Sequence, residues 1–289
     1  MRLFVFGMGY SAQALVDRLR AHAKLAWLGA TARSEEAERD LRAAGIDTVR
    51  FDGTAPAPDL GATLRVASHV LLSIPPGAEG DPVLRLHRDQ LLKAAPGLSW
   101  IGYLSTVGVY GDHHGEWVTE ESECRPVSGR SRNRLAAEKA WLAFAEDSGV
   151  PVGIFRLAGI YGPGRNTLDK LRAGKAKRVV KPGQIFNRIH VEDIAAVLEA
   201  AMARPATAIY NVADDEPAPP QDVVAHGAEL LGLAPPPEVP FAEAGLSDMA
   251  GTFWGESKRI SNRRIREELG VELAYPTYRE GLSSLAKNG

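Results

Sequence analysis

A glycine-rich turn near the N-terminus constrains the fold of this chain more than any other feature. The apolar run 2–6 leads directly into Gly7-Met8-Gly9-Tyr10-Ser11-Ala12, and a helical pattern of apolar residues follows. This order of strand, glycine turn and helix is the context in which a parallel sheet binds a dinucleotide. Gly7 is expected to make the tight turn, Gly9 to admit a pyrophosphate, and Ala12 to pack the helix on the strand. Tyr10 and Ser11 open that helix, whose first N–H groups attract negative charge, and Ser11 is a candidate for its cap.

Six further apolar runs alternate with helical patterns, at 25–28, 48–51, 69–74, 100–105, 152–156 and 209–212. Continuous apolar strands separated by helices indicate a parallel sheet covered on both faces. The sequence therefore predicts an α/β fold, a doubly wound Rossmann sheet of about seven strands.

The C-terminal part of the chain has a different pattern. Two proline clusters, at 217–220 and 235–237, accompany helical patterns at 221–231 and 262–269. We expect a dinucleotide-binding core at 1–160, an interleaved segment at 161–215, and a smaller, mainly helical substrate lobe at 216–289.

Composition excludes several classes of protein. Lys and Arg number 34 against 36 Asp and Glu, a net charge of −2, which disfavours a nucleic-acid binder. No apolar run reaches the roughly 18–20 residues that a membrane span needs, nor does the N-terminus have the apolar length of a secretory signal, so a cytoplasmic protein is expected. The single cysteine, Cys124, has no intramolecular disulfide partner.

The residues after the second strand discriminate between the two nicotinamide dinucleotides. An acidic residue there would bind the ribose 2′-hydroxyl of NAD, whereas this chain has Arg33 and Ser34. A guanidinium and a hydroxyl suit the 2′-phosphate of NADP. The next residues, Glu35 and Glu36, would partly oppose a phosphate, and a solvated surface arginine is the simpler interpretation. We predict NADP, with NAD as the alternative.

Further candidate cofactor residues follow the third and fourth strands. Asp52 is positioned to accept from an adenine amino group, although an aspartate that opens a turn explains it equally well. Ser73, Ile74 and Pro75 lie at the end of the fourth strand, on the edge where open sheets bind ligands. Prolines that merely stop the strand are the alternative there.

Five motifs in order give the chain a family resemblance. Besides the glycine turn, they are Leu104-Ser105-Thr106-Val107-Gly108-Val109-Tyr110-Gly111, Arg156-Leu157-Ala158-Gly159-Ile160-Tyr161-Gly162-Pro163-Gly164, Asn187-Arg188-Ile189-His190-Val191-Glu192-Asp193 and Tyr210-Asn211-Val212. Together they resemble the extended short-chain dehydrogenase/reductase superfamily, in its atypical branch of nucleoside-diphosphate-sugar epimerase/dehydratase-like proteins. The resemblance covers nearly the whole chain.

That resemblance implies a Ser or Thr, a Tyr, and a Lys four residues later as the catalytic set. Thr106 matches the first position, but counting back from Glu138 places Arg130 at the tyrosine position and Arg134 at the lysine position. Arginine stays protonated, so it can donate hydrogen bonds to a ribose or phosphate but cannot exchange a proton. The resemblance therefore implies that either another residue supplies the proton or the site does no hydride chemistry.

Substitute proton donors are Tyr110, after the fifth strand, and Tyr161, after the sixth. Simple packing is the alternative for each. His113 and His114, beside Asp112, are further candidates because histidine titrates near neutrality, although paired loop histidines are usually solvated. The ligand spacing of a metal site is missing, so no metal is predicted.

Basic residues concentrate in the middle of the chain, at Arg125, Arg130, Arg132, Arg134, Arg165, Lys170, Arg172, Lys175, Lys177 and Arg178. A solvated face explains such a run; convergence of several would suit a small anionic or nucleotide-sugar substrate. Two functions remain open: an NADP-dependent oxidoreductase or epimerase/dehydratase, and a non-catalytic NADP-binding sensor or scaffold. The resemblance is compatible with a monomer or a homodimer.

Overall fold

The computed structural model describes residues 1–288, and the side chains of residues 248–250 and 288 lie outside the description. The chain forms two compact units, each built from three segments. The first comprises Met1–Thr106, Gly129–Arg156 and Ala195–Tyr210; the second comprises Val107–Ser128, Leu157–Ile194 and Asn211–Gly289. The segment 107–128 thus belongs with the second unit, whereas the sequence alone places it in the core.

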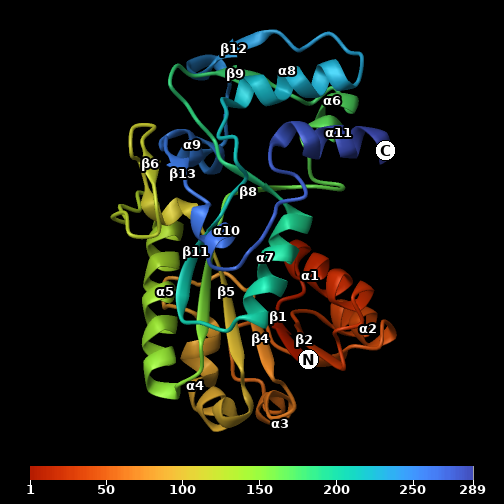
Figure 1. The fold of residues 1–289 in the computed structure, drawn as a ribbon, viewed down its shortest axis with the longest axis vertical. Helices are drawn as coiled ribbons and strands as arrows, with labels where there is room; N and C mark the ends of the chain where they lie inside the picture. Colours follow the sequence, from red (N-terminus) through yellow and green to blue (C-terminus); the bar gives the residue numbers. More distant parts are fainter. Residues whose placement is uncertain (289) are drawn as a thin grey trace. The chain divides into compact units, whose positions relative to one another are not determined.

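A seven-stranded parallel sheet with the order β11-β7-β5-β4-β1-β2-β3 is central to the fold (Figure 1). Its strands are β1 (Arg2–Phe6), β2 (Trp27–Ala32), β3 (Asp47–Arg50), β4 (His69–Leu72), β5 (Trp100–Thr106), β7 (Val152–Leu157) and β11 (Ala208–Val212). The strand order reverses direction beside β1, as expected of a doubly wound sheet. The predicted α/β Rossmann sheet is confirmed.

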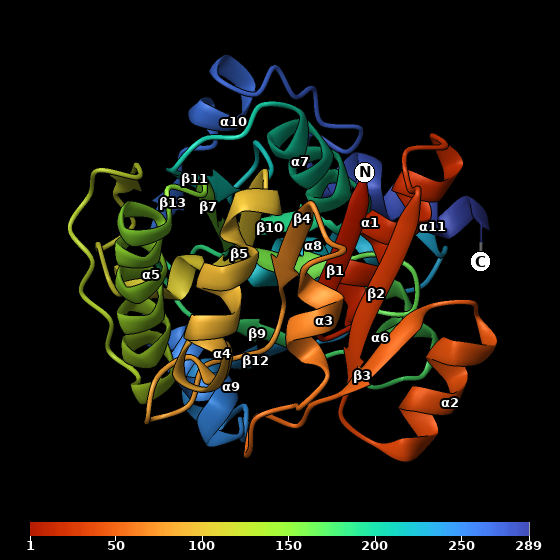
Figure 2. The same ribbon diagram turned by 90° about the horizontal axis from the view of Figure 1, so that it is seen from below.

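The helices of the first unit connect these strands. They are α1 (Tyr10–Ala21), α2 (Glu35–Ala43), α3 (Leu60–Leu64), α4 (Pro82–Ala94), α5 (Gly129–Ser148) and α7 (Val191–Ala203), whose first residues belong to the second unit. Figure 2 shows α4 and α5 beside β4 and β5. The main apolar core fills this layer, with Phe4, Tyr103 and Trp141 almost completely buried.

A buried ion pair ties α5 to β7 within the first unit. Nη2 of Arg156 lies 2.7 Å from Oε2 of Glu138, and Nε of Arg156 also donates to both carboxylate oxygens. The hydroxyl of Ser105 on β5 donates to the same carboxylate. Three neighbouring elements therefore share one buried polar cluster, which satisfies charges that would be costly to bury alone.

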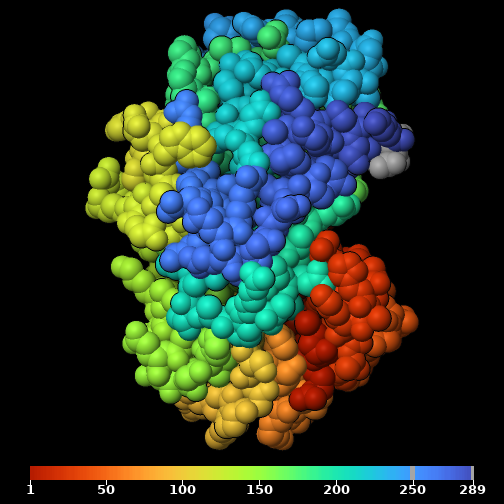
Figure 3. Space-filling view, viewed as in Figure 1, coloured from red at the N-terminus to blue at the C-terminus, as the bar shows by residue number. Residues whose placement is uncertain are grey.

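A second cluster joins α1 to α7. Glu199 accepts from Arg18 at 2.6 Å, pairs with His22 at 2.7 Å and lies 2.8 Å from Nζ of Lys24. The space-filling view places N-terminal and α7 atoms in contact (Figure 3). Burial alone would raise the pKa of the Glu199 carboxyl, but Lys24, His22 and Arg18 outweigh it and lower the pKa to about 2.

The second unit consists mainly of helices and short strand pairs. β10 pairs with β8, β12 with β9, and β13 with β6. Its elements are β6 (Trp117–Val118), β8 (Gly159–Tyr161), α6 (Thr167–Arg172), β9 (Arg178–Val180), β10 (Arg188–His190), α8 (Pro220–Leu230), β12 (Glu238–Pro240), α9 (Asp248–Trp254), β13 (Arg259–Ile260), α10 (Arg263–Glu267) and α11 (Tyr278–Asn288). Tyr161, Tyr278 and Leu282 belong to its apolar core.

Several local expectations need correction. Gly9, not Ser11, is the N-cap of α1, because the helix already begins at Tyr10 and Ser11 is buried within its first turn. The second strand spans Trp27–Ala32 rather than 25–28, since the small residues Gly29, Ala30 and Ala32 are buried in the sheet without adding to a strong apolar run. The helix predicted at 262–269 is shorter, at Arg263–Glu267. Within residues 1–288, no helix combines the length and apolarity of a membrane span.

Candidate functional site

The glycine turn between β1 and α1 has the backbone geometry predicted for it. Gly7 adopts φ +87°, and its amide donates to the Thr31 hydroxyl on β2 at 2.9 Å. The amide of Gly9 donates back to the Gly7 carbonyl at 2.9 Å, which closes the turn. A left-handed residue is tolerated best when it is glycine, so the sequence and the turn agree.

The surroundings of this turn fit a diphosphate group. Among the described residues, α1 has no acidic side chain in its first turn and no side chain that caps it. A Cβ on Gly7 would lie 3.0 Å from Cγ1 of Ile74, whereas one on Gly9 would meet only the Ser73 hydroxyl, at 3.7 Å. The structure thus brings Ser73 and Ile74, predicted from a distant part of the sequence, against the turn. The first N–H groups of α1, those of Tyr10, Ser11 and Ala12, are of the kind that binds phosphate.

Arg33 and Ser34 follow β2 directly. Arg33 is exposed, and Ser34 is the N-cap of α2, with its hydroxyl accepting from the Ala37 amide at 3.3 Å. Glu35 and Glu36, which would repel a phosphate, are exposed in the first turn of α2. The capping role explains Ser34 without a ligand, so Arg33 is the stronger candidate for a phosphate contact.

Asp52 is engaged in a local turn. Its carboxylate accepts from the amide of Thr54 at 2.8 Å and from the hydroxyl of Thr54 at 2.7 Å. These bonds lower the pKa of the Asp52 carboxyl. The turn alternative has direct geometric support; the adenine contact stays a prediction. Pro75, the last of the predicted cofactor residues, is exposed beyond β4.

At the end of β5 the structure brings Arg134 and Thr106 into the same unit. Nη1 of Arg134 donates to the Leu104 carbonyl at 2.8 Å and to the Tyr103 hydroxyl at 3.2 Å. The guanidinium also lies over the Tyr103 ring, 5.5 Å from its centroid. Burial raises the pKa of the Tyr103 phenol, which therefore remains protonated. Arg134 is thus held as a fixed, half-buried cation against the strand that carries Thr106, while Arg130 is exposed.

Tyr110 and Tyr161 both lie in the second unit. Tyr110 is fully buried, and its hydroxyl donates to Oδ1 of Asn211 at 2.7 Å. The Tyr161 hydroxyl donates to the Thr277 carbonyl at 3.4 Å, and burial raises the pKa of its phenol. Gly281 of α11 lies so close that a Cβ there would be 2.0 Å from the Tyr161 oxygen. Both tyrosines have the packing expected of structural residues, and their role as proton donors stays a prediction.

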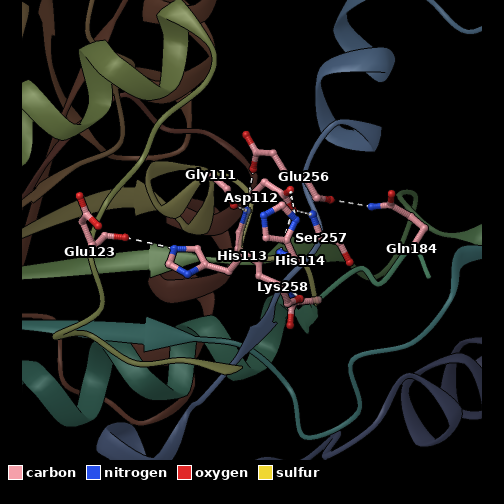
Figure 4. A network of polar contacts seen from close by, with 10 residues as sticks. Gly111, Asp112, His113, His114, Glu123, Gln184, Glu256, Ser257 and Lys258 are labelled. Carbon is pink, nitrogen blue, oxygen red and sulfur yellow. Dashed lines mark hydrogen bonds and ion pairs between the residues drawn. The ribbon is translucent and has the colours of Figure 1, made fainter. Parts of the chain in front are cut away.

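The two loop histidines take part in a polar network within the second unit (Figure 4). Asp112 accepts from the amides of His114 and Ser257, and its second oxygen lies 3.0 Å from Nδ1 of His114. The buried ammonium of Lys258 donates to the Gly111 carbonyl at 2.7 Å and to Glu256 at 2.6 Å. Burial lowers the pKa of this ammonium. Across the described part of the chain, no His, Cys, Asp and Glu side chains gather as a metal site.

Several of the basic residues in the middle of the chain have local partners. Arg125 pairs with Glu123 at 2.7 Å, Arg178 with Glu238 at 3.1 Å, and Arg172 with Asp169 at 3.5 Å. Lys177 donates to the Ala244 carbonyl at 2.9 Å. The solvated-face interpretation therefore accounts for much of this run, and Arg134 is the member held beside β5.

Residues 86–213 match the NAD dependent epimerase/dehydratase family. That segment contains the end of β5, the helix with Arg134, and the strands that follow. This segment thus resembles that family, in agreement with the resemblance predicted from the sequence motifs.

Two curated relatives match this chain over part of their own length. Protein YeeZ from Escherichia coli K12 is 34% identical over 60% of this chain and 58% of its own. The 3-diazoavenalumate denitrifying reductase from a Streptomyces species is 31% identical over 45% of each chain. The match thus spans about half the length of these relatives.

Solved structures of similar proteins match this chain over almost its full length. A conserved protein of unknown function from Silicibacter pomeroyi is 46% identical, with a TM-score of 0.87, over 99% of this chain and 98% of the other. MoeE5, solved in complex with UDP-glucose and NAD, is 23% identical with a TM-score of 0.75, over the same shares of the two chains. The latter likeness concerns the fold alone.

Two features of the site were missed by sequence reasoning. Arg50 ends β3 in register with Ala32 and pairs with Glu35 at 3.2 Å, which places another cation near Arg33. Tyr103 holds Arg134, although it lies outside the residues matched to the catalytic set. The only available signal concerned Arg50, which lies at the carboxyl end of its strand, where ligands of such sheets bind. Tyr103 lies in the middle of β5 and gave no such signal.

Proposed function

We propose that this chain is a member of the epimerase/dehydratase family that binds NADP(H) and works as an oxidoreductase or epimerase on a small anionic or nucleotide-sugar substrate. The observation that carries the proposal is the turn at Gly7 and Gly9, which opens α1 without a capping or acidic side chain, together with Arg33 after β2. A glycine-lined helix start suits a diphosphate, and a guanidinium in place of an acid suits a 2′-phosphate.

Different residues of the first unit would contact different parts of the cofactor. The turn from Gly7 to Ala12 would hold the diphosphate, Arg33 the 2′-phosphate, and Ser73 with Ile74 would line the adjacent wall. When bound, the nicotinamide supplies or accepts a hydride. Arg134 is positioned to donate hydrogen bonds to a ribose hydroxyl or a substrate oxygen, because its guanidinium is already fixed on β5.

The same fixed guanidinium limits the chemistry. Arg134 cannot exchange a proton, so it stabilises negative charge on an oxygen without neutralising it. Thr106, half-buried at the end of β5, is the candidate to hydrogen-bond that oxygen. We infer a substrate that carries an oxyanion or acidic group, or one whose reduction needs no strong general acid. The reductase name of one relative and the UDP-glucose bound to MoeE5 are compatible with a small-molecule substrate.

Cofactor binding is the direct test. NADPH and NADH are titrated into the purified chain, with nicotinamide fluorescence and calorimetry as readouts. Arg33→Asp is expected to weaken NADPH binding about 10- to 100-fold, the loss typical of a charge-assisted contact, and to leave NADH almost unchanged. Arg20→Asp, the same charge change on the exposed last turn of α1, is the control. If the wild-type protein binds neither NADPH nor NADH, the proposal is overturned.

A second function, an NADP-dependent sensor without turnover, is favoured by the packing of the two tyrosines. Tyr110 and Tyr161 are buried and bonded within the second unit, and Arg130 and Arg134 occupy the expected catalytic positions. Oxidation of NADPH against a panel of carbonyl compounds and nucleotide sugars separates the two functions. Turnover that survives Thr106→Ala, Tyr110→Phe and Tyr161→Phe together would remove every acid/base role assigned to these residues.

A further inference from the structure

Arg50 ends β3 next to the residues expected to discriminate NADP from NAD. Ala32, the last residue of β2, is paired in register with Arg50, and the amide of Phe51 donates to the Ala32 carbonyl at 2.9 Å. Arg33 follows Ala32 directly. Neighbouring strands lie about 4.8 Å apart, so the two arginines leave the same edge of the sheet on adjacent strands.

The partners of Arg50 bind it weakly. Its Nη1 lies 3.2 Å from Oε1 of Glu35 and 3.8 Å from Oε2 of Glu38. The side chain of Arg50 is 48% exposed and that of Glu35 is 81% exposed, so solvent screens the closer pair strongly. Glu38 has a shorter partner of its own, Arg42, at 2.7 Å. Arg50 is therefore free to exchange Glu35 for a more highly charged anion.

The charges around the start of α2 explain why a second cation is needed. Glu35, Glu36 and Glu38 all lie in the first turn of this helix, immediately after Arg33. A phosphate bound by Arg33 alone would face these carboxylates, and the hydroxyl of Ser34 is already used as the helix cap. Arg50 offsets part of that negative charge from the neighbouring strand.

We propose that Arg50 is a specificity-determining residue that binds the 2′-phosphate of NADP together with Arg33, and that Glu35 competes with the phosphate for it. This inference rests on the proposed NADP-binding function. Glu35 then acts as an internal counter-ion: it neutralises Arg50 in the free protein and is displaced when the phosphate binds.

Adenosine 2′,5′-bisphosphate and adenosine 5′-monophosphate test this without nicotinamide chemistry, because they differ only in the 2′-phosphate. Calorimetry on the full chain gives the affinity ratio of the two probes. Arg50→Gln is expected to lower the affinity for the bisphosphate about tenfold and to change that for the monophosphate less than about twofold. Glu35→Gln is expected to raise bisphosphate affinity about two- to fivefold.

The double variant Arg50→Gln/Glu35→Gln distinguishes competition from a general change of surface charge. If Glu35 acts by competing for Arg50, its substitution changes bisphosphate affinity only while Arg50 is present. Arg39→Gln, which removes an exposed cation from the same helix, is the matched control and is expected to leave the affinity ratio unchanged. Melting temperatures of all variants report whether the fold is retained.

The results of these titrations distinguish a failure of this inference from a failure of the proposed NADP-binding function. A wild-type protein that binds both probes equally overturns the 2′-phosphate assignment and Arg50 with it. A protein that prefers the bisphosphate, loses the preference on Arg33→Asp and keeps it on Arg50→Gln overturns the role of Arg50 alone. If Glu35→Gln raises bisphosphate affinity by the same factor with and without Arg50, Glu35 does not compete with the phosphate for Arg50.

Discussion

Arg156 and Glu138 form a bidentate ion pair inside the first unit, with 2.7 Å between Nη2 and Oε2 and both side chains shielded from water. Glu138 also accepts from Ser105, so its carboxylate bridges α5, β7 and β5. Each partner satisfies a charge that the other would otherwise leave buried and alone. The pair therefore makes the first unit sensitive to the loss of either side chain.

Glu138→Ala is expected to lower the free energy of unfolding by about 3–5 kcal/mol, because it leaves the buried guanidinium of Arg156 without its counter-charge. Urea denaturation followed by circular dichroism measures the change. Glu146→Ala removes an exposed carboxylate from the same helix and serves as the control. Equal stability of Glu138→Ala and Glu146→Ala would contradict the expectation.

Gly7→Ala is expected to destabilise the first unit by about 1–3 kcal/mol and to weaken dinucleotide binding. The substitution forces alanine into φ +87° and places its Cβ 3.0 Å from Cγ1 of Ile74. Thermal unfolding gives the first effect and an NADPH titration the second. Gly45→Ala is the matched control, because Gly45 has φ +72° but open space around its Cβ. Loss of stability in both variants with loss of binding only in Gly7→Ala supports the role of the turn.

Asp214 gives the second unit a predicted dependence on pH. Its side chain is 1% exposed, so its carboxylate is shielded from water. Burial raises the pKa of this carboxyl to about 8, although the nearby Arg188 opposes the shift. The folded state therefore holds a proton that the unfolded chain, with a pKa near 4, releases. Stability is expected to fall as the pH rises from about 4 to 8 and to level off above that.

Asp214→Asn should flatten this pH dependence and stabilise the protein at pH 9 by about 1–3 kcal/mol, since a neutral amide replaces a buried carboxylate. Melting temperatures between pH 5 and 9 provide the measurement. The exposed Glu272→Gln is the control. If the wild-type and Asp214→Asn curves run parallel, the buried carboxyl does not titrate in this range.

Tyr110→Phe and Tyr161→Phe are expected to differ in stability. Tyr110→Phe leaves Oδ1 of the buried Asn211 without its donor at 2.7 Å and should lower the free energy of unfolding by about 1–3 kcal/mol. Tyr161→Phe loses a contact of only 3.4 Å and should lower it by less than about 1 kcal/mol. Neither change should alter NADPH affinity. Chemical denaturation and cofactor titration on the same samples check both statements, and a drop in kcat with unchanged stability would identify a proton donor instead.

The sheet and the glycine turn could be predicted because their signals are local. An apolar strand, two glycines and an amphipathic helix lie within about twenty residues, and short-range sterics favour one arrangement of them. The end of β2 was harder, because Gly29, Ala30 and Ala32 are buried without forming a strongly apolar run. The cap of α1 was misassigned because the backbone of Gly9 begins the helix without a side chain.

The polar pairs of the site could not be predicted in the same way. Tyr103 and Arg134 are 31 residues apart, and Arg50 meets Glu35 only because β3 lies beside β2. Such contacts depend on the angle at which each helix crosses the sheet, which periodicity does not report. Asp214 presents a further difficulty: one of two adjacent aspartates is buried and the other is exposed.

The contacts of Glu199 also affect the N-terminal end of α1, because they hold the whole helix in position. Arg18, Lys24 and the imidazole of His22 converge on the Glu199 carboxylate of α7 from the C-terminal half of α1 and the residues just after it. A shift of α1 along its axis would break all three contacts together, so they fix the C-terminal end of the helix. The N-terminal turn of α1, in contrast, has no side-chain cap over its amides. If this turn binds the proposed diphosphate, the helix that presents its amides is already fixed before binding, and little conformational entropy is lost on association.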